Sequence, residues 1–113
     1  MEETKMDTSK ELSEQQRSVS DLIHELYNRL AQADDPKTKD IRESLMRAYQ
    51  HIGQRDPVVV ANKLANYLHF TGYNEKIKFT ESELELITQI SQIGQHAGLN
   101  GSYRAWYGDK SQF

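Results

Sequence analysis

The four histidines are the side chains of this chain best suited to metal binding, acid–base catalysis or phosphotransfer. Each lies in a segment predicted below to be a separate helix, so no two of them share a helix face. His24-Glu25 opens like a His-Glu-x-x-His zinc motif, but its fifth position is Asn28, which is not a zinc ligand. Solvated or core-edge positions explain His24, His51, His69 and His96. Phosphotransfer on one histidine, as in small helical phosphocarrier domains, stays open as an enzymatic alternative.

Other catalytic patterns are weak in this sequence. Carboxylate pairs such as Asp34-Asp35 fall at predicted helix ends, where capping explains them. The chain has no cysteine and no Gly-rich phosphate loop, which argues against thiol, thiolate-metal and nucleotide chemistry. A basic cluster resembles the anion clamp of helical mutases, but acidic neighbours make it a solvated helix face: Lys37, Lys39, Arg42, Arg47 and Arg55. We therefore predict no catalytic residue, cofactor site or metal site.

The composition of the chain limits its partners and its location. Fourteen basic and 17 acidic residues among 113 give a formal net charge of -3, which disfavours nucleic-acid binding. The longest apolar run is Val58 to Ala61, far below the roughly 20 residues needed to span a bilayer. The acidic first five residues are followed by no apolar stretch, so no secretory signal is predicted. We expect a cytoplasmic protein with at most peripheral membrane contact.

Apolar residues recur every three or four positions in four segments, which is the pattern of amphipathic helices. In order along the chain, the helices are predicted at 13–32, 36–52, 57–71 and 81–98, after a frayed N-terminus at 1–12 and before a C-terminal tail at 99–113. Because the predicted loops are short, neighbouring helices should be antiparallel. The sequence thus predicts one all-α domain over 1–113, an antiparallel up-down four-helix bundle with an irregular aromatic C-terminal tail.

Capping residues mark most of the predicted helix boundaries. Asp35-Pro36 and Asp56-Pro57 each place a capping carboxylate before a proline suited to the first helical position. Thr80 and Glu83 have the spacing of a capping box. Gly53 and Gly72 follow the second and third apolar stripes, where we expect left-handed C-caps.

The C-terminal tail has an unusual composition. Four of the chain's ten aromatic residues lie in its last eleven positions, and Tyr103, Trp106 and Tyr107 surround Arg104. Disordered termini are usually poor in aromatics, whereas Trp, Tyr and Arg dominate interface energetics. Either these rings, that of Phe113 included, fold back to cover a hydrophobic groove of the bundle, as considered in particular for Tyr103 or Trp106, or the tail presents a recognition surface, and both can hold. The loop containing Lys76 and Lys78, beside Tyr73, is a second candidate surface.

Two segments of the chain resemble the immunity proteins of pediocin-like (class IIa) bacteriocins. One is Asp56 to Leu68, with the sequence Asp-Pro-Val-Val-Val-Ala-Asn-Lys-Leu-Ala-Asn-Tyr-Leu. The other is Lys76 to Ile90, which opens with Lys-Ile-Lys-Phe-Thr-Glu-Ser-Glu-Leu. The length and the helix order also match, so the resemblance covers most of the chain. It implies an antiparallel four-helix bundle with a C-terminal segment, in agreement with the helical periodicity.

The resemblance also implies a function without catalysis. Members of this family are thought to associate, from the cytosolic side, with the membrane-embedded mannose phosphotransferase permease that the bacteriocin uses as its receptor. Discrimination between toxins is attributed largely to the C-terminal half. Carried over by segment, the expected partner-binding residues are Tyr103, Arg104, Trp106 and Tyr107, followed by Lys76 and Lys78.

Two other readings of the sequence stay open. One is a helical adaptor or regulatory protein that binds a protein partner through its C-terminal tail. The other is a small phosphocarrier or mutase-like enzyme, which would depend on one histidine or on the basic cluster. Increased tolerance to a pediocin-like peptide in a sensitive strain distinguishes an immunity protein from both.

Overall fold

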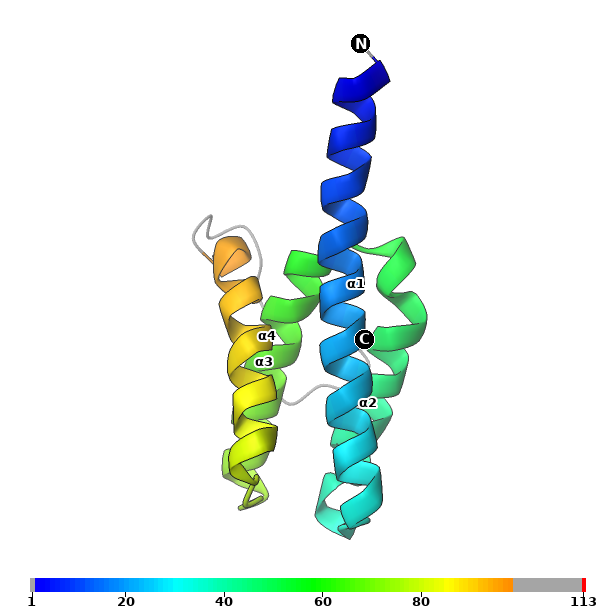
Figure 1. Ribbon diagram of the computed structural model, residues 1–113. Helices are drawn as coiled ribbons and strands as arrows, with labels where there is room; N and C mark the ends of the chain where they lie inside the picture. The colour runs from blue at the N-terminus through cyan, green and yellow to red at the C-terminus, as the bar shows by residue number, and fades with distance from the viewer. Residues whose placement is uncertain (1, 99–112) are drawn as a thin grey trace.

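The described part of the protein is built from four α-helices (Figure 1). The computed structural model describes residues 2–98 and 113, with the side chains of 14–95 and 113. The helices are α1 (Glu2–Ala33), α2 (Lys39–His51), α3 (Pro57–Asn74) and α4 (Glu81–Gly98), and short 3-10 helices at Pro36–Thr38 and Ile52–Gln54 flank α2. No strand occurs in these residues. The predicted all-α bundle is confirmed.

Helix α1 is longer than its predicted range of 13–32. It begins at Glu2, and its N-terminal part extends well beyond the other helices (Figure 1). Residues 2–12 contain no glycine or proline and include three Glu, two Lys, one Met and one Leu, which favour a helix, so nothing in this stretch interrupts it. Among the side chains of α1 that the structure describes, which begin at residue 14, Val19 is the first that is buried. The predicted frayed segment at 1–12 is therefore helical from Glu2 onward.

Three of the predicted capping sites are confirmed: Asp35 caps the 3-10 helix that precedes α2, Asp56 caps α3, and Thr80 lies at the start of α4. The Oδ1 atoms of Asp35 and Asp56 accept hydrogen bonds from the backbone N–H groups two residues later, at 3.0 and 2.9 Å. Thr80 and Glu83 form a reciprocal capping box. The Thr80 N–H donates to Glu83 Oε1 at 2.9 Å, and the Glu83 N–H donates to Thr80 Oγ1 at 3.2 Å. Each start follows from local chemistry that needs no tertiary contact.

The predicted glycine C-caps are wrong, because neither Gly53 nor Gly72 has a left-handed backbone. Gly53 lies inside the 3-10 helix that follows α2, and Gly72 lies inside α3. A Cβ at Gly72 would come 2.8 Å from the Phe79 ring, so this glycine makes room for a side chain. The described non-glycine residues with left-handed backbone are Asp34 (φ 49°), which directly follows α1, and Lys76 (φ 53°), two residues after the end of α3.

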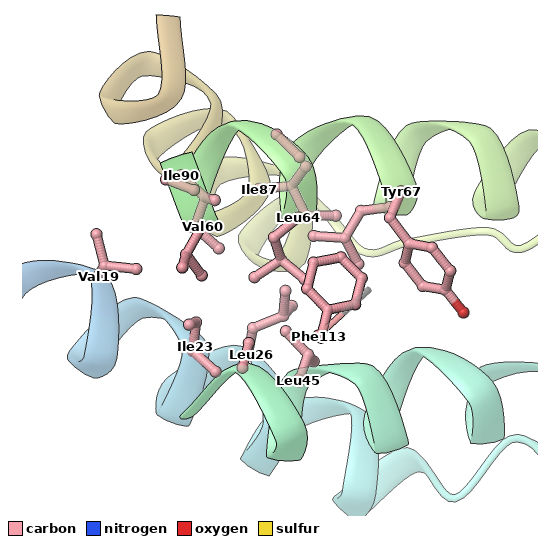
Figure 2. Close-up of a cluster of buried hydrophobic side chains, with 14 of the residues drawn as sticks. Val19, Ile23, Leu26, Leu45, Val60, Leu64, Tyr67, Ile87, Ile90 and Phe113 are labelled. Carbon is pink, nitrogen blue, oxygen red and sulfur yellow. The ribbon is translucent and has the colours of Figure 1, made fainter. Parts of the chain in front are cut away.

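The core is a continuous cluster to which all four helices contribute (Figure 2). Helix α1 supplies Val19, Ile23 and Leu26. The buried apolar residues of the next two helices include Ile41, Leu45 and Ala48 of α2 and Val60, Ala61, Leu64, Tyr67 and Leu68 of α3, whereas Thr71 is half-buried and Tyr49 is 44% exposed. The most extensive helix pair is α3 with α4. There the two backbones come so close that a Cβ at Gly94 would lie 2.5 Å from the Asn62 backbone. Gly94 therefore fixes the crossing point of α3 and α4.

Candidate functional site

The predicted partner-binding residues fall into two groups at different places along the chain. Tyr103, Arg104, Trp106 and Tyr107 lie outside the described residues. Lys76 and Lys78 are exposed in the turn that joins α3 to α4. Since α4 has 18 residues, this turn lies about 27 Å from the end of α4 after which the tail begins. Lys76 and Lys78 thus precede α4 in the chain, whereas the four tail residues follow it.

The turn between α3 and α4 is held by backbone hydrogen bonds of the Schellman type. The Ile77 N–H donates to the Gly72 carbonyl at 2.9 Å, and the Lys76 N–H donates to the Tyr73 carbonyl at 3.3 Å. This arrangement places Lys76 in the left-handed region that glycine usually occupies at this position. The turn is therefore rigid in its backbone, while its lysine side chains extend into solvent.

The surface of this turn combines aromatic and cationic groups. Tyr73 is 85% exposed and lines a shallow depression of about 550 Å³ together with Lys76, Lys78 and the backbone between them. Phe70 and Leu84, which are 41% and 45% exposed, are also large apolar side chains at the surface. An exposed tyrosine beside two lysines has the composition of an interface anchor. The structure thus places Lys76, Lys78 and Tyr73 around one depression.

The last residue of the sequence, Phe113, is buried in the bundle (Figure 2). Its ring is 3% exposed and packs edge-on against Tyr67 of α3, with ring centroids 5.4 Å apart. Nδ1 of His51, in the last turn of α2, lies 2.9 Å from the main-chain oxygen of Phe113. Because a carbonyl oxygen only accepts, this contact requires the proton on Nδ1. Residues 99–112 therefore join the end of α4 to a second fixed point between α2 and α3.

The sequence analysis included Phe113 among the tail rings considered for folding back onto the bundle, and its burial confirms this for Phe113, whereas Tyr103 and Trp106 lie outside the described part of the chain. The residue type agrees with this burial. Phe113 is the one aromatic of the tail without a polar atom, so it can be buried completely without a hydrogen-bond partner. A variant that lacks the C-terminal tail also lacks Phe113, so such a deletion removes a core residue as well as the tail.

The basic and histidine side chains considered for chemistry make structural contacts. Arg42 Nη1 lies 3.4 Å from Asp34 Oδ1, and Arg47 Nη2 lies 3.7 Å from Glu43 Oε1. The ring of His24 packs against Tyr49 with centroids 5.8 Å apart. Within the described residues, no three histidine or acidic side chains are grouped to hold a metal ion. Arg42 and Arg47 of the basic cluster thus pair with carboxylates of the bundle itself.

The site and the fold together define a small helical bundle with candidate binding surfaces at its turns and in its tail. Residues 14–95 match the model of the bacteriocin immunity protein family, which covers nearly all of the bundle. The chain belongs to this family. In the described residues, no helix is both long enough and apolar enough to cross a membrane.

Individual relatives agree with the family assignment. The chain is 40% identical over 90 residues to a probable mesentericin-Y105 immunity protein of Leuconostoc mesenteroides, covering 78% of this chain and 80% of the relative. It is 38% identical over 81 residues to a probable leucocin-A immunity protein of Leuconostoc gelidum, covering 71% and 72%. Among solved structures it is similar to the crystal structure of EntA-im, an immunity protein for the pediocin-like bacteriocin enterocin A. That match has 49% identity and a TM-score of 0.63 over 84% of this chain and 99% of EntA-im.

Proposed function

We propose that this protein protects its cell against a pediocin-like bacteriocin, without catalysis, by binding the toxin-occupied mannose phosphotransferase permease from the cytosolic side. The observation that carries the proposal is 49% identity to EntA-im, which confers immunity to the pediocin-like bacteriocin enterocin A. The similarity to probable immunity proteins for mesentericin Y105 and leucocin A supports the same class of toxin. The permease follows from the resemblance of the sequence to this family.

The contacts of the polar side chains favour binding over catalysis. Arg42 and Arg47 are ion-paired, and His51 holds the main-chain oxygen of Phe113. A catalytic group needs to reach a substrate, whereas these groups are occupied by the protein itself. The exposed groups at the turn between α3 and α4 are of the kind that contributes to protein interfaces: Tyr73, Lys76 and Lys78.

Selective protection requires differential affinity. A protein that closes only the toxin-occupied permease must bind that state more tightly than the empty one, because equal affinity shifts no equilibrium. A shift of the permease from 1% to 99% closed needs a preference of about 10⁴, or about 5.5 kcal/mol. A few aromatic and cationic anchors, each contributing about 2 kcal/mol, supply a preference of this size.

The direct test is expression of the protein in a sensitive bacterium, followed by killing curves with a panel of pediocin-like bacteriocins. Selective protection against one or a few members supports the proposal. Absence of protection across a panel that includes enterocin A, mesentericin Y105 and leucocin A, with the protein soluble and helical, would argue for the helical adaptor instead. Co-purification with the mannose permease in the presence and absence of toxin then tests the partner.

Single substitutions in the protective protein test which residues bind the permease. Trp106→Ala should weaken association with the toxin-occupied permease by about 2 kcal/mol or more while the bundle stays folded. Smaller losses are expected for Tyr103, Arg104 and Tyr107. Lys76→Glu with Lys78→Glu tests the turn between α3 and α4, and Lys39→Glu, on an exposed lysine of α2, is the matched control. Phe113 is kept in every variant because it belongs to the core.

A further inference from the structure

A groove on the described surface lies between α1 and α4. It has a volume of about 790 Å³ and lies at the end of the bundle where α3 begins and α4 ends. Its floor is apolar and consists of Leu22 from α1, Val58 from α3 and Ile93 from α4, all half-buried. Leu22 and Ile93 pack against the core cluster, so the floor is a fixed surface.

The rims of the groove differ in charge. The α1 rim carries three carboxylates, Glu14, Asp21 and Glu25, whereas the α4 rim carries the neutral amides of Gln89 and Gln92. No lysine or arginine is among the described residues that line the groove. The groove therefore has an apolar floor and one acidic wall.

Two of these carboxylates have no counter-ion in the described part of the chain. Glu25 binds Arg29 at 3.0 Å, one turn further along α1. Glu14 and Asp21 are exposed and form no ion pair with a described side chain, and exposed Arg17, between them in sequence, is not a lining residue. A cation brought into the groove by a partner would meet Glu14 and Asp21 without displacing an internal ion pair.

We propose that this groove binds a basic amphipathic helix of the protein's partner. The apolar stripe of such a helix covers Leu22, Val58 and Ile93, and its lysines or arginines pair with Glu14 and Asp21. The inference deepens the proposed function, on which it rests for the identity of the partner. It adds a binding surface on the bundle itself, apart from the tail and from the turn between α3 and α4.

The spacing of the carboxylates fits a helical occupant. Glu14 and Asp21 are seven residues apart on α1, which corresponds to about 10.5 Å along the helix axis. A second helix lying alongside α1 presents residues seven positions apart at the same distance, since two turns of helix span seven residues. The volume accommodates the side chains of one helix face, as in other helix-in-groove complexes, in which the rest of the helix stays outside.

The first test measures binding of a designed peptide to the purified full-length protein by fluorescence anisotropy. The probe is a labelled helix of about 18 residues, with a leucine stripe and two flanking lysines seven positions apart; the control peptide has glutamates in place of the lysines. We expect the lysine peptide to bind more tightly than the control. Asp21→Lys and Gln92→Lys should each weaken its binding roughly tenfold, because each places a positive charge inside the groove, where it repels the lysines of the peptide. The matched control Gln50→Lys adds the same charge on exposed α2 and should leave binding unchanged.

Three results would overturn the inference. One is no binding of the lysine peptide at millimolar concentration. Another is equal weakening by Gln50→Lys and Gln92→Lys, which would indicate attraction to the net charge of the protein alone. A third is a dimer in sedimentation experiments that Gln92→Lys dissociates, since the occupant would then be a second copy of this chain.

Killing curves separate this inference from the proposed function. If the wild-type protein protects, Asp21→Lys should lose protection and Gln50→Lys should keep it, with both variants as stable as the wild type. Protection by Asp21→Lys equal to the wild type would overturn the groove while leaving the immunity function intact. If the wild-type protein protects against no toxin, the proposed function fails, and the peptide experiment alone decides about the groove.

Discussion

Replacement of Phe113 by alanine should destabilise the whole bundle, although the residue lies 15 positions beyond the end of α4. Its side chain is 3% exposed and packs against Tyr67. Complete truncation of a buried phenylalanine costs about 3–5 kcal/mol. The edge-on aromatic contact contributes about 0.5–1.5 kcal/mol to such a loss. We expect a loss at the lower end of this range, about 3 kcal/mol.

Urea and thermal denaturation measure this loss. At about 2.1 cal/mol/K of unfolding entropy per residue, a chain of 113 residues loses about 4 °C of Tm per kcal/mol, so Phe113→Ala should lower Tm by about 12 °C. Phe113→Leu should recover most of the loss, because leucine refills the apolar site. Tyr73→Ala, at an aromatic that is 85% exposed, is the control and should change stability by less than about 0.5 kcal/mol. If Phe113→Ala is as stable as the wild type, the anchoring of the tail to α2 and α3 is refuted.

Three further substitutions test the helix junctions by the same denaturation measurements. Gly94→Ala should lower the free energy of unfolding by more than about 2 kcal/mol, because the added Cβ would lie 2.5 Å from the Asn62 backbone. The control Gln95→Ala, at an exposed position, should leave stability nearly unchanged. Equal stabilities of the two variants would contradict the close crossing of α3 and α4. Lys76→Gly should raise the free energy of unfolding by about 0.5–1 kcal/mol, since glycine adopts the left-handed backbone at φ 53° without strain. A loss of stability would show that the lysine side chain contributes more than the strain costs. Thr80→Ala should cost about 1 kcal/mol through the orphaned Glu83 N–H, and Thr80→Ser should restore it; an unchanged midpoint for the alanine variant would mean that the capping box adds nothing to stability.

The helix starts and the buried faces were predictable from the sequence because they depend on local chemistry. A capping aspartate before a proline acts on backbone groups two residues away, and an apolar stripe needs only the helical period. The starts at Asp35, Asp56 and Thr80 accordingly agree with the prediction. The beginning of α1 did not follow, because helix-favouring residues 2–12 carry no apolar stripe to report on the helix.

The helix ends and the roles of the glycines were less predictable, because they depend on which parts of other elements pack against them. Gly72 and Gly94 look like cap or stripe positions in the sequence, yet in the structure each makes room for a neighbour, the Phe79 ring in one case and the Asn62 backbone in the other. The left-handed position after α3 is occupied by Lys76, which no propensity scale would select.

For the candidate site, the sequence pointed to the aromatic tail and to Lys76 and Lys78 through residue type alone. The structure places the two lysines beside Tyr73 and buries Phe113. The acidic groove could not be found from the sequence, since its walls come from residues about 70 positions apart, such as Asp21 and Gln92.

By itself, the sequence determined an all-α chain of amphipathic helices, since periodicity and capping act within a few residues, and the resemblance of two of its segments indicated the family. The tertiary structure alone decided which glycines allow close approach, that Phe113 closes the core against His51 and Tyr67, and that α1 and α4 leave a groove with one acidic wall. These features depend on distances between residues far apart in the chain, and such distances are fixed only when the helices pack.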